Sequence, residues 1–215
     1  IDLRTTGSVV LNGGTASTTN HAYILSAGMI QSSPTIGSLY LMANDSNCYL
    51  RSSGSLLLNV NGDVNLVGGA TSGSAYFSGV GSPPFSMTIN GGNLSLQAGS
   101  GAGTSAYISG YTLSDISATG NVLIRGGPVG ANGTAYILGA AAASASLVGN
   151  SISIEGGISN VLTNNAYFQT TSGSLLRVET TGGNLNLQGG GHINNEAYIQ
   201  ANTADVNVLS AGNII

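Results

Sequence analysis

Residues 182–200 read GGNLNLQGGGHINNEAYIQ, and both halves of this stretch return along the whole chain. The first half has a cap residue, then aliphatic residues at alternate positions, then a pair of small residues. The segments GDVNLVGG at 62–69 and GGNLSLQAG at 91–99 follow the same order. The cap residues recur every 25–33 residues, which is typical of solenoid repeats. They are Ser8, Ser38, Asp63, Asn93, Asn121, Ser151, Asn184 and Asn213.

Two aliphatic columns follow the caps. The first holds Val9, Leu39, Val64, Leu94, Val122, Ile152, Leu185 and Ile214, and the second holds Leu11, Leu41, Leu66, Leu96, Ile124, Ile154 and Leu187. Residues two apart in a strand share a face, so the columns predict a short strand with one buried face. The small pair after it is usually Gly-Gly. We expect these glycines to turn the chain through positive φ angles.

The second half of the opening stretch predicts another strand. A small column holds Ala22, Cys48, Ala75, Ala106, Ala135, Ala166 and Ala197, and a large column holds Ile24, Leu50, Phe77, Ile108, Ile137, Phe168 and Ile199. Between them every unit has a tyrosine: Tyr23, Tyr49, Tyr76, Tyr107, Tyr136, Tyr167 and Tyr198. The residue two before each tyrosine is polar. The tyrosines are therefore predicted to form one outward, partly exposed column.

A third and weaker strand is expected shortly before the caps, where apolar pairs recur. These pairs are Ile1/Leu3, Met87/Ile89, Leu176/Val178 and Val206/Val208. The segment GAAAASASLVG at 139–149 occupies the same phase of the repeat. Alanine has the best helix propensity, but the repeat phase favours a strand or its loop here.

Together these columns predict an all-β chain, a single-stranded parallel β-helix of about seven coils with three short strands per coil. The crossover rule for parallel strands favours a right-handed coil. Residues 1–215 are interpreted as one continuous solenoid that begins and ends in mid-coil, because IDLRTTGS at 1–8 matches VNVLSAGN at 206–213. On this interpretation the chain is part of a longer repetitive protein.

Composition excludes several classes of function. Only 6% of the residues are charged, lysine is absent and the net charge is −4, so nucleic acid is not an expected partner. Glycine, serine and asparagine interrupt every apolar stretch, and we expect no membrane-spanning segment. The single Cys48 excludes an internal disulfide and is interpreted as a small buried hydrophobe.

Catalytic and metal-binding patterns are weak, and we expect no enzyme activity, metal or cofactor. The register places Arg125 and Glu155 in one outward column on adjacent coils, which predicts an ordinary cross-strand ion pair. The two histidines, His21 and His192, are six coils apart. The glycine pairs lack the lysine of a phosphate-binding loop and precede no helix.

The glycine-, serine- and asparagine-rich rungs of the form GNLxLxGG, without lysine, resemble the passenger shafts of bacterial autotransporters and filamentous-haemagglutinin-type adhesins. The resemblance covers the whole chain and is one of architecture and composition. It implies a secreted or cell-surface protein with a structural role in reach, adhesion or fibre building. The alternative is a polysaccharide-binding or polysaccharide-cleaving β-helix of the tailspike or pectate-lyase kind.

The tyrosine column is the candidate binding site, with three alternatives. In the first the rings only stack on each other and shield their strand, in the second they pack against a neighbouring shaft, and in the third they bind glycans. Self-association, end to end and laterally, is the expected partnership, and glycans or the surface of a host or neighbouring cell are the other expected partners.

Overall fold

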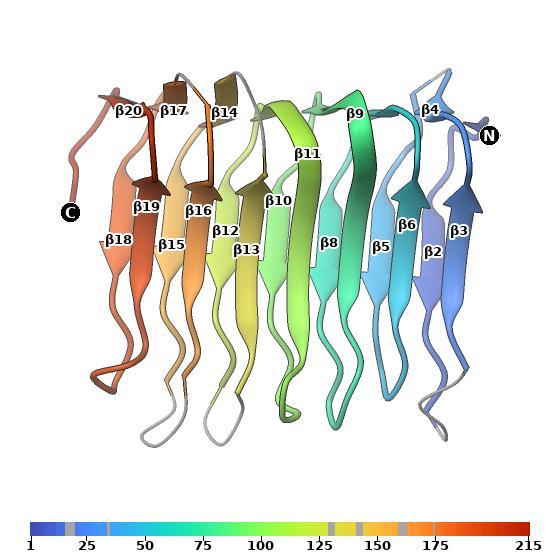
Figure 1. Cartoon of the computed structure of the whole chain (residues 1–215), viewed down its shortest axis with the longest axis horizontal. Helices are drawn as coiled ribbons and strands as arrows, with labels where there is room; N and C mark the ends of the chain where they lie inside the picture. Colours follow the sequence, from blue (N-terminus) through green and yellow to red (C-terminus); the bar gives the residue numbers. More distant parts are fainter. Residues whose placement is uncertain (16–19, 34, 129–131, 141–143, 159–162, 174) are drawn as a thin grey trace.

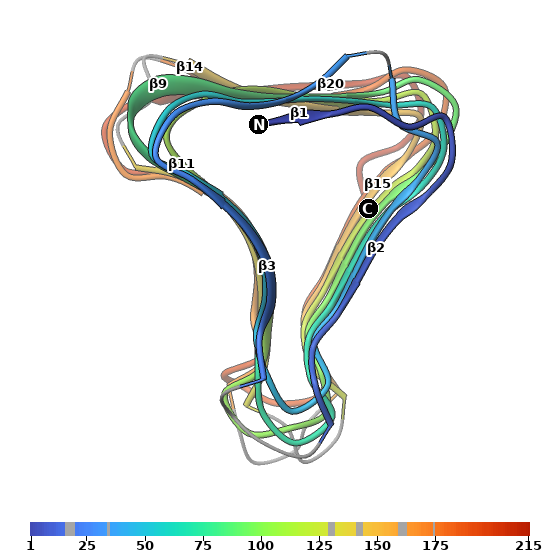
Figure 2. The ribbon, with the colours of Figure 1, turned by 90° about the vertical axis from the view of Figure 1, so that its right-hand side faces the viewer.

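The computed structural model describes residues 1–15, 20–33, 35–128, 132–140, 144–158, 163–173 and 175–215, which contain strands and no helix. The chain winds into a parallel β-solenoid of about six full turns (Figure 1). Viewed from its N-terminal end, it runs along the upper edge, down the right side and up the left side as it recedes (Figure 2). This clockwise path is a right-handed helix, as the crossover rule predicts.

The strands after the caps form one seven-stranded parallel sheet, called the first wall. It contains β2 (Val9–Asn12), β5 (Leu39–Met42), β8 (Val64–Val67), β10 (Leu94–Gln97), β12 (Val122–Arg125), β15 (Ile152–Glu155) and β18 (Leu185–Gln188), paired in chain order. Both aliphatic columns stay in register through the sheet. The eighth unit also keeps the phase, because Ile214 bridges Leu185. The predicted sheet and its order are confirmed.

The second predicted strand forms the tyrosine wall. It contains β3 (Ala22–Ser26), β6 (Cys48–Ser52), the first part of β9 (Ala75–Ile89), the first part of β11 (Ser105–Ala118), β13 (Thr134–Gly139), β16 (Ala166–Thr170) and β19 (Ala197–Ala201). Its Ala and Ile columns line the core. In cross-section this wall curves inward and approaches the first wall at the lower end (Figure 2).

The third wall closes the coil. It contains β1 (Asp2–Leu3), β4 (Ile30–Ser32), β7 (Leu56–Val60), the second parts of β9 and β11, β14 (Ser144–Gly149), β17 (Leu175–Thr180) and β20 (Asp205–Ser210). Met87, Ile89, Leu176 and Val178 are buried, as the apolar pairs predict. The alanine-rich segment 139–149 supplies β14 and not a helix, although 141–143 lie outside the described residues.

Close approach, and not positive φ, explains the Gly-Gly pairs, so that expectation was wrong. Among the described residues only Gly73, Gly103 and Gly173 have positive φ, and none belongs to a pair. A Cβ at Gly126 would lie 2.5 Å from the carbonyl oxygen of Asn164, which belongs to the segment entering the tyrosine wall. The pairs lack side chains because the two walls converge there.

Packing of the converging walls also explains the alanine column. Ala75, Ala106, Ala135 and Ala166 are buried at the beginning of the strands of the tyrosine wall, next to the end where this wall approaches the first wall (Figure 2), and the larger Phe77 and Ile108 are buried two residues on. Small residues at the narrow end and large ones at the wide end keep the interior filled.

In the described part of the chain there is no helix long and apolar enough to cross a membrane.

Candidate functional site

The seven tyrosines of the tyrosine wall form one continuous stack, called the tyrosine ladder. Each tyrosine pairs in register with the tyrosine of the next coil. The six successive ring pairs have centroid separations of 4.7–5.1 Å and interplanar angles of 2–8°. The ring spacing equals the spacing of strands in a sheet, because each ring repeats the rotamer of its neighbour.

The ladder points outward. The residues on either side of each tyrosine along the strand belong to the core, so the pleat directs the rings away from it. Tyr23 is 54% exposed, and the other six rings are intermediate in burial. Each inner ring has both faces against neighbouring rings. Solvent and any partner therefore meet the ring edges and hydroxyls, and a sugar could stack face to face only on an end ring.

The environment of the central rings favours the protonated phenol. Burial raises the pKa of Tyr136 from 10.0 to about 12. It also raises the pKa of Tyr107 and Tyr167, and neighbouring tyrosines raise both further. Arg51 opposes the rise at Tyr107, because a nearby cation favours the phenolate. At neutral pH these three rings therefore present neutral hydroxyls, which both donate and accept hydrogen bonds.

A polar column borders the ladder and ties successive coils together. The backbone N–H of Asn47 donates to Nδ1 of His21 at 3.2 Å, and the N–H of Ser74 donates to Oδ1 of Asn47 at 2.9 Å. One coil later, the N–H of Ser105 donates to Oγ of Ser74 at 3.3 Å. These polar residues satisfy backbone donors where the strand begins.

The cap column of the first wall follows the same rule. The N–H of Asn93 donates to Oδ1 of Asp63 at 2.8 Å, and the N–H of Asn121 donates to Oδ1 of Asn93 at 2.9 Å. At the last cap, the N–H of Asn213 donates to Oδ1 of Asn184 at 2.9 Å. The Asp and Asn residues at these caps are thus acceptors for the next coil.

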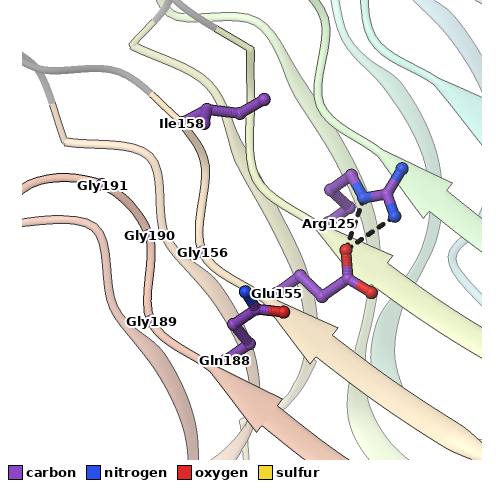
Figure 3. Close-up of a pocket in the computed structure, with 8 residues that line it drawn as sticks. All are labelled: Arg125, Glu155, Gly156, Ile158, Gln188, Gly189, Gly190 and Gly191. Carbon is purple, nitrogen blue, oxygen red and sulfur yellow. Dashed lines mark hydrogen bonds and ion pairs between the residues drawn. The ribbon is translucent and has the colours of Figure 1, made fainter.

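Arg125 and Glu155 form the ion pair that the register predicts. The Nη2 and Oε2 atoms are 2.6 Å apart, and Nε of Arg125 donates to the same oxygen at 2.7 Å (Figure 3). The other carboxylate oxygen accepts from Oγ of Ser153 at 2.7 Å. The pair borders a hollow of about 590 Å³, which Gln188 and Gly189 also line. Both carboxylate oxygens are already engaged, which favours a structural or binding role over acid–base chemistry.

The other chemistry-bearing residues do not gather. His21 and His192 lie at opposite ends of the solenoid, and the described residues contain no group of three or more His, Cys, Asp or Glu placed to hold a metal. Cys48 is buried in the alanine column, and its Sγ donates to the carbonyl of Leu11 at 3.0 Å. Burial raises the pKa of its thiol to about 11, so it is protonated and packs as a small hydrophobe, as expected.

The structure also has an apolar hollow that the sequence did not reveal. It measures about 270 Å³ and lies where the tyrosine wall turns into the third wall, lined by Val80, Tyr111, Leu138 and the glycines beside them. In this region β9 and β11 continue around the corner, with register shifts after Gly110 and Leu113. Val80 and Tyr111 lie beyond the columns of the tyrosine wall, where the sequence shows no repeated pattern that indicates which way they face.

Comparisons with known proteins add nothing to the fold and the site described above. No family model matches the chain, and neither the curated proteins nor the solved structures contain a match.

Proposed function

We propose that the chain is a non-enzymatic structural solenoid that forms the shaft of a large extracellular or cell-surface fibre or adhesin. One observation supports this most strongly: the columns of the first wall and the tyrosine wall keep their register from coil to coil. A stack of this kind transmits load along its axis through parallel rows of hydrogen bonds. It can also be lengthened coil by coil without changing its cross-section.

The surface chemistry suits the same role. Arg4, Arg125 and Arg177 are paired with Asp2, Glu155 and Glu179. The outward columns consist largely of hydroxyl and amide side chains. A surface of low charge with many neutral hydrogen-bonding groups favours contact with glycans and with neighbouring shafts over contact with polyanions. We include lateral and end-to-end self-association in the proposal for this reason.

Location and mechanics test the proposal together. Antibodies against this chain should label the outside of intact cells, and pulling the purified chain along its axis should give a stiff response with stepwise loss of coils. Labelling confined to the cytosol would contradict the surface location. Unfolding at low force, without steps, would contradict the shaft role.

Polysaccharide binding is the second candidate, and the hollow beside Glu155 favours it. A carboxylate, a guanidinium and the amide of Gln188 border a space large enough for a sugar residue. Glu155→Gln should weaken binding to any glycan that an array identifies, with Glu179→Gln on the third wall as the control. Cleavage would appear as new reducing ends, and their release by the purified chain would overturn the non-enzymatic proposal.

A further inference from the structure

The tyrosine ladder is an unbroken stack of oxidisable side chains. Six ring-to-ring steps of 4.7–5.1 Å connect Tyr23 to Tyr198. Electron tunnelling slows steeply with distance, so a series of short steps is faster than one long jump across the wall. We propose that the ladder is a redox relay, which carries a one-electron oxidation from ring to ring along the solenoid axis. This function is separate from the mechanical role proposed above.

Each transfer in the relay is balanced. A one-electron oxidant, such as a trivalent ruthenium complex or the oxidised haem of a peroxidase, removes an electron from an accessible phenol, whose proton passes to water. The resulting phenoxyl radical then takes one electron and one proton from the phenol of the next ring. The first ring becomes a neutral phenol again, and the next ring becomes the radical. No net charge moves along the wall.

The geometry favours this coupled movement of electron and proton. All seven members are tyrosines in register, so successive transfers differ little in free energy. The rings are parallel and 4.7–5.1 Å apart, so neighbouring hydroxyls are too far apart for a direct hydrogen bond, and the proton passes from one phenol oxygen to the next through a bridging water. Burial favours the neutral phenol at Tyr107 and Tyr136. A half-buried site disfavours charged intermediates and so couples the proton to the electron.

The rest of the chain supplies a matched tyrosine outside the ladder. Tyr40 faces outward on the first wall, where its cross-strand neighbours are Val10 and Asn65. It has the same side chain as the ladder residues and lies on a different wall. Tyr40→Phe therefore removes one phenol from the protein and leaves the ladder intact.

The experiment starts an oxidation at one end of the ladder and detects it at the other. Cys48→Ala removes the natural thiol and restores the residue that its column holds elsewhere. Glu196→Cys then places a single thiol on the exposed outer face, two residues before Tyr198, for attachment of a ruthenium photo-oxidant. After a flash with a sacrificial electron acceptor, a radical trap marks oxidised tyrosines, and peptide mass spectrometry compares adducts at Tyr23 and Tyr198. Dilution series exclude transfer between molecules.

Interruption of the ladder gives the decisive comparison. Tyr107→Phe keeps the ring and its stacking but has no hydroxyl hydrogen to give up. In this variant the adduct at Tyr23 should fall to the level seen without light, while the adduct at Tyr198 remains. Tyr40→Phe should leave the ratio of the two adducts unchanged. Equal labelling of Tyr23 in the Tyr107→Phe variant, or no labelling of Tyr23 in the unbroken ladder, would overturn the relay.

Discussion

Inside the solenoid the first wall and the tyrosine wall both bury two regular columns, but outside it they differ. The middle outward position of the first wall holds Val10, Tyr40, Asn65, Ser95, Leu123, Ser153 and Asn186, whereas the tyrosine wall holds tyrosine in every coil. Packing of the core requires regular inner columns. It does not require a regular outer column, as the first wall demonstrates. The uniform tyrosines therefore reflect an interaction among the rings or with a partner.

Substitutions in the inner columns should lower the free energy of unfolding most, and by equal amounts on the two walls. Leu96 on β10 and Ile108 on β11 are both fully buried. Leu96→Ala and Ile108→Ala should each lower the free energy of unfolding by about 2–5 kcal/mol, through lost burial and the cavity left behind. Chemical denaturation followed by circular dichroism measures both. A cost well below this range on one wall would show that this wall is not part of the common core.

Substitutions in the outer columns should have different effects on the stability of the two walls. The double substitution Tyr107→Ser with Tyr136→Ser removes three stacked ring pairs, and aromatic pairs contribute about 0.5–1.5 kcal/mol each. The chain should stay folded with a reduced free energy of unfolding, and any lateral assembly or glycan binding should weaken. Tyr40→Ser on the first wall should cost less, since its cross-strand neighbours are not aromatic. Complete unfolding of the double variant would place the ring column in the core.

Alkaline pH should weaken the tyrosine wall specifically. The pKa of Tyr136 is about 12 in the folded chain against an ordinary 10.0. Between these values the unfolded chain loses the phenol proton while the folded chain keeps it. In the Cys48→Ala background, which removes the buried thiol that titrates in an overlapping range, the free energy of unfolding should therefore be steady below pH 10 and fall as the pH rises toward 12. Denaturant titrations across this range measure the fall, and Tyr136→Phe should make it shallower. If Tyr136→Phe leaves the dependence of the unfolding free energy on pH unchanged, the ring is more hydrated than the structure indicates.

The ion pair on the first wall should contribute least to the free energy of unfolding. Arg125 and Glu155 lie on the surface, and exposed pairs contribute about 0–1 kcal/mol. Glu155→Gln should change the free energy of unfolding within that range, and salt should reduce the difference. A double-mutant cycle with Arg125→Ala isolates the coupling. A coupling well above this range would show that the pair behaves as a buried contact and stabilises the two coils that it joins.

The inner columns and their register could be predicted from the sequence because strand periodicity leaves few choices. A cap followed by aliphatics at alternate positions fixes which residues stack, and the pairing of Arg125 with Glu155 confirms this through coils of unequal length. The outward direction of the tyrosines followed from the same pleat. The β14 strand followed from repeat phase, which outweighs the helix propensity of alanine when neighbouring coils supply strand partners.

Three features could not be predicted, because they depend on how the walls meet. The inward curve of the tyrosine wall brings the Gly-Gly pairs against the opposite backbone, and no local pattern reports that distance. The continuation of β9 and β11 around a corner depends on the shape of the coil at Gly79 and Gly110. Whether the tyrosines present faces or edges depends on a rotamer shared by the whole column.

The hydrogen bonds of the polar columns also favour one order in which the coils fold. At Ser74, Asn93 and Asn121, the backbone N–H of a later coil donates to a side chain of the coil before it. A chain emerging from a ribosome completes its N-terminal coils first. Each finished coil then offers ready acceptors to the segment that emerges next, so it serves as a template for its successor. Growth from the opposite end would find only backbone donors at these positions.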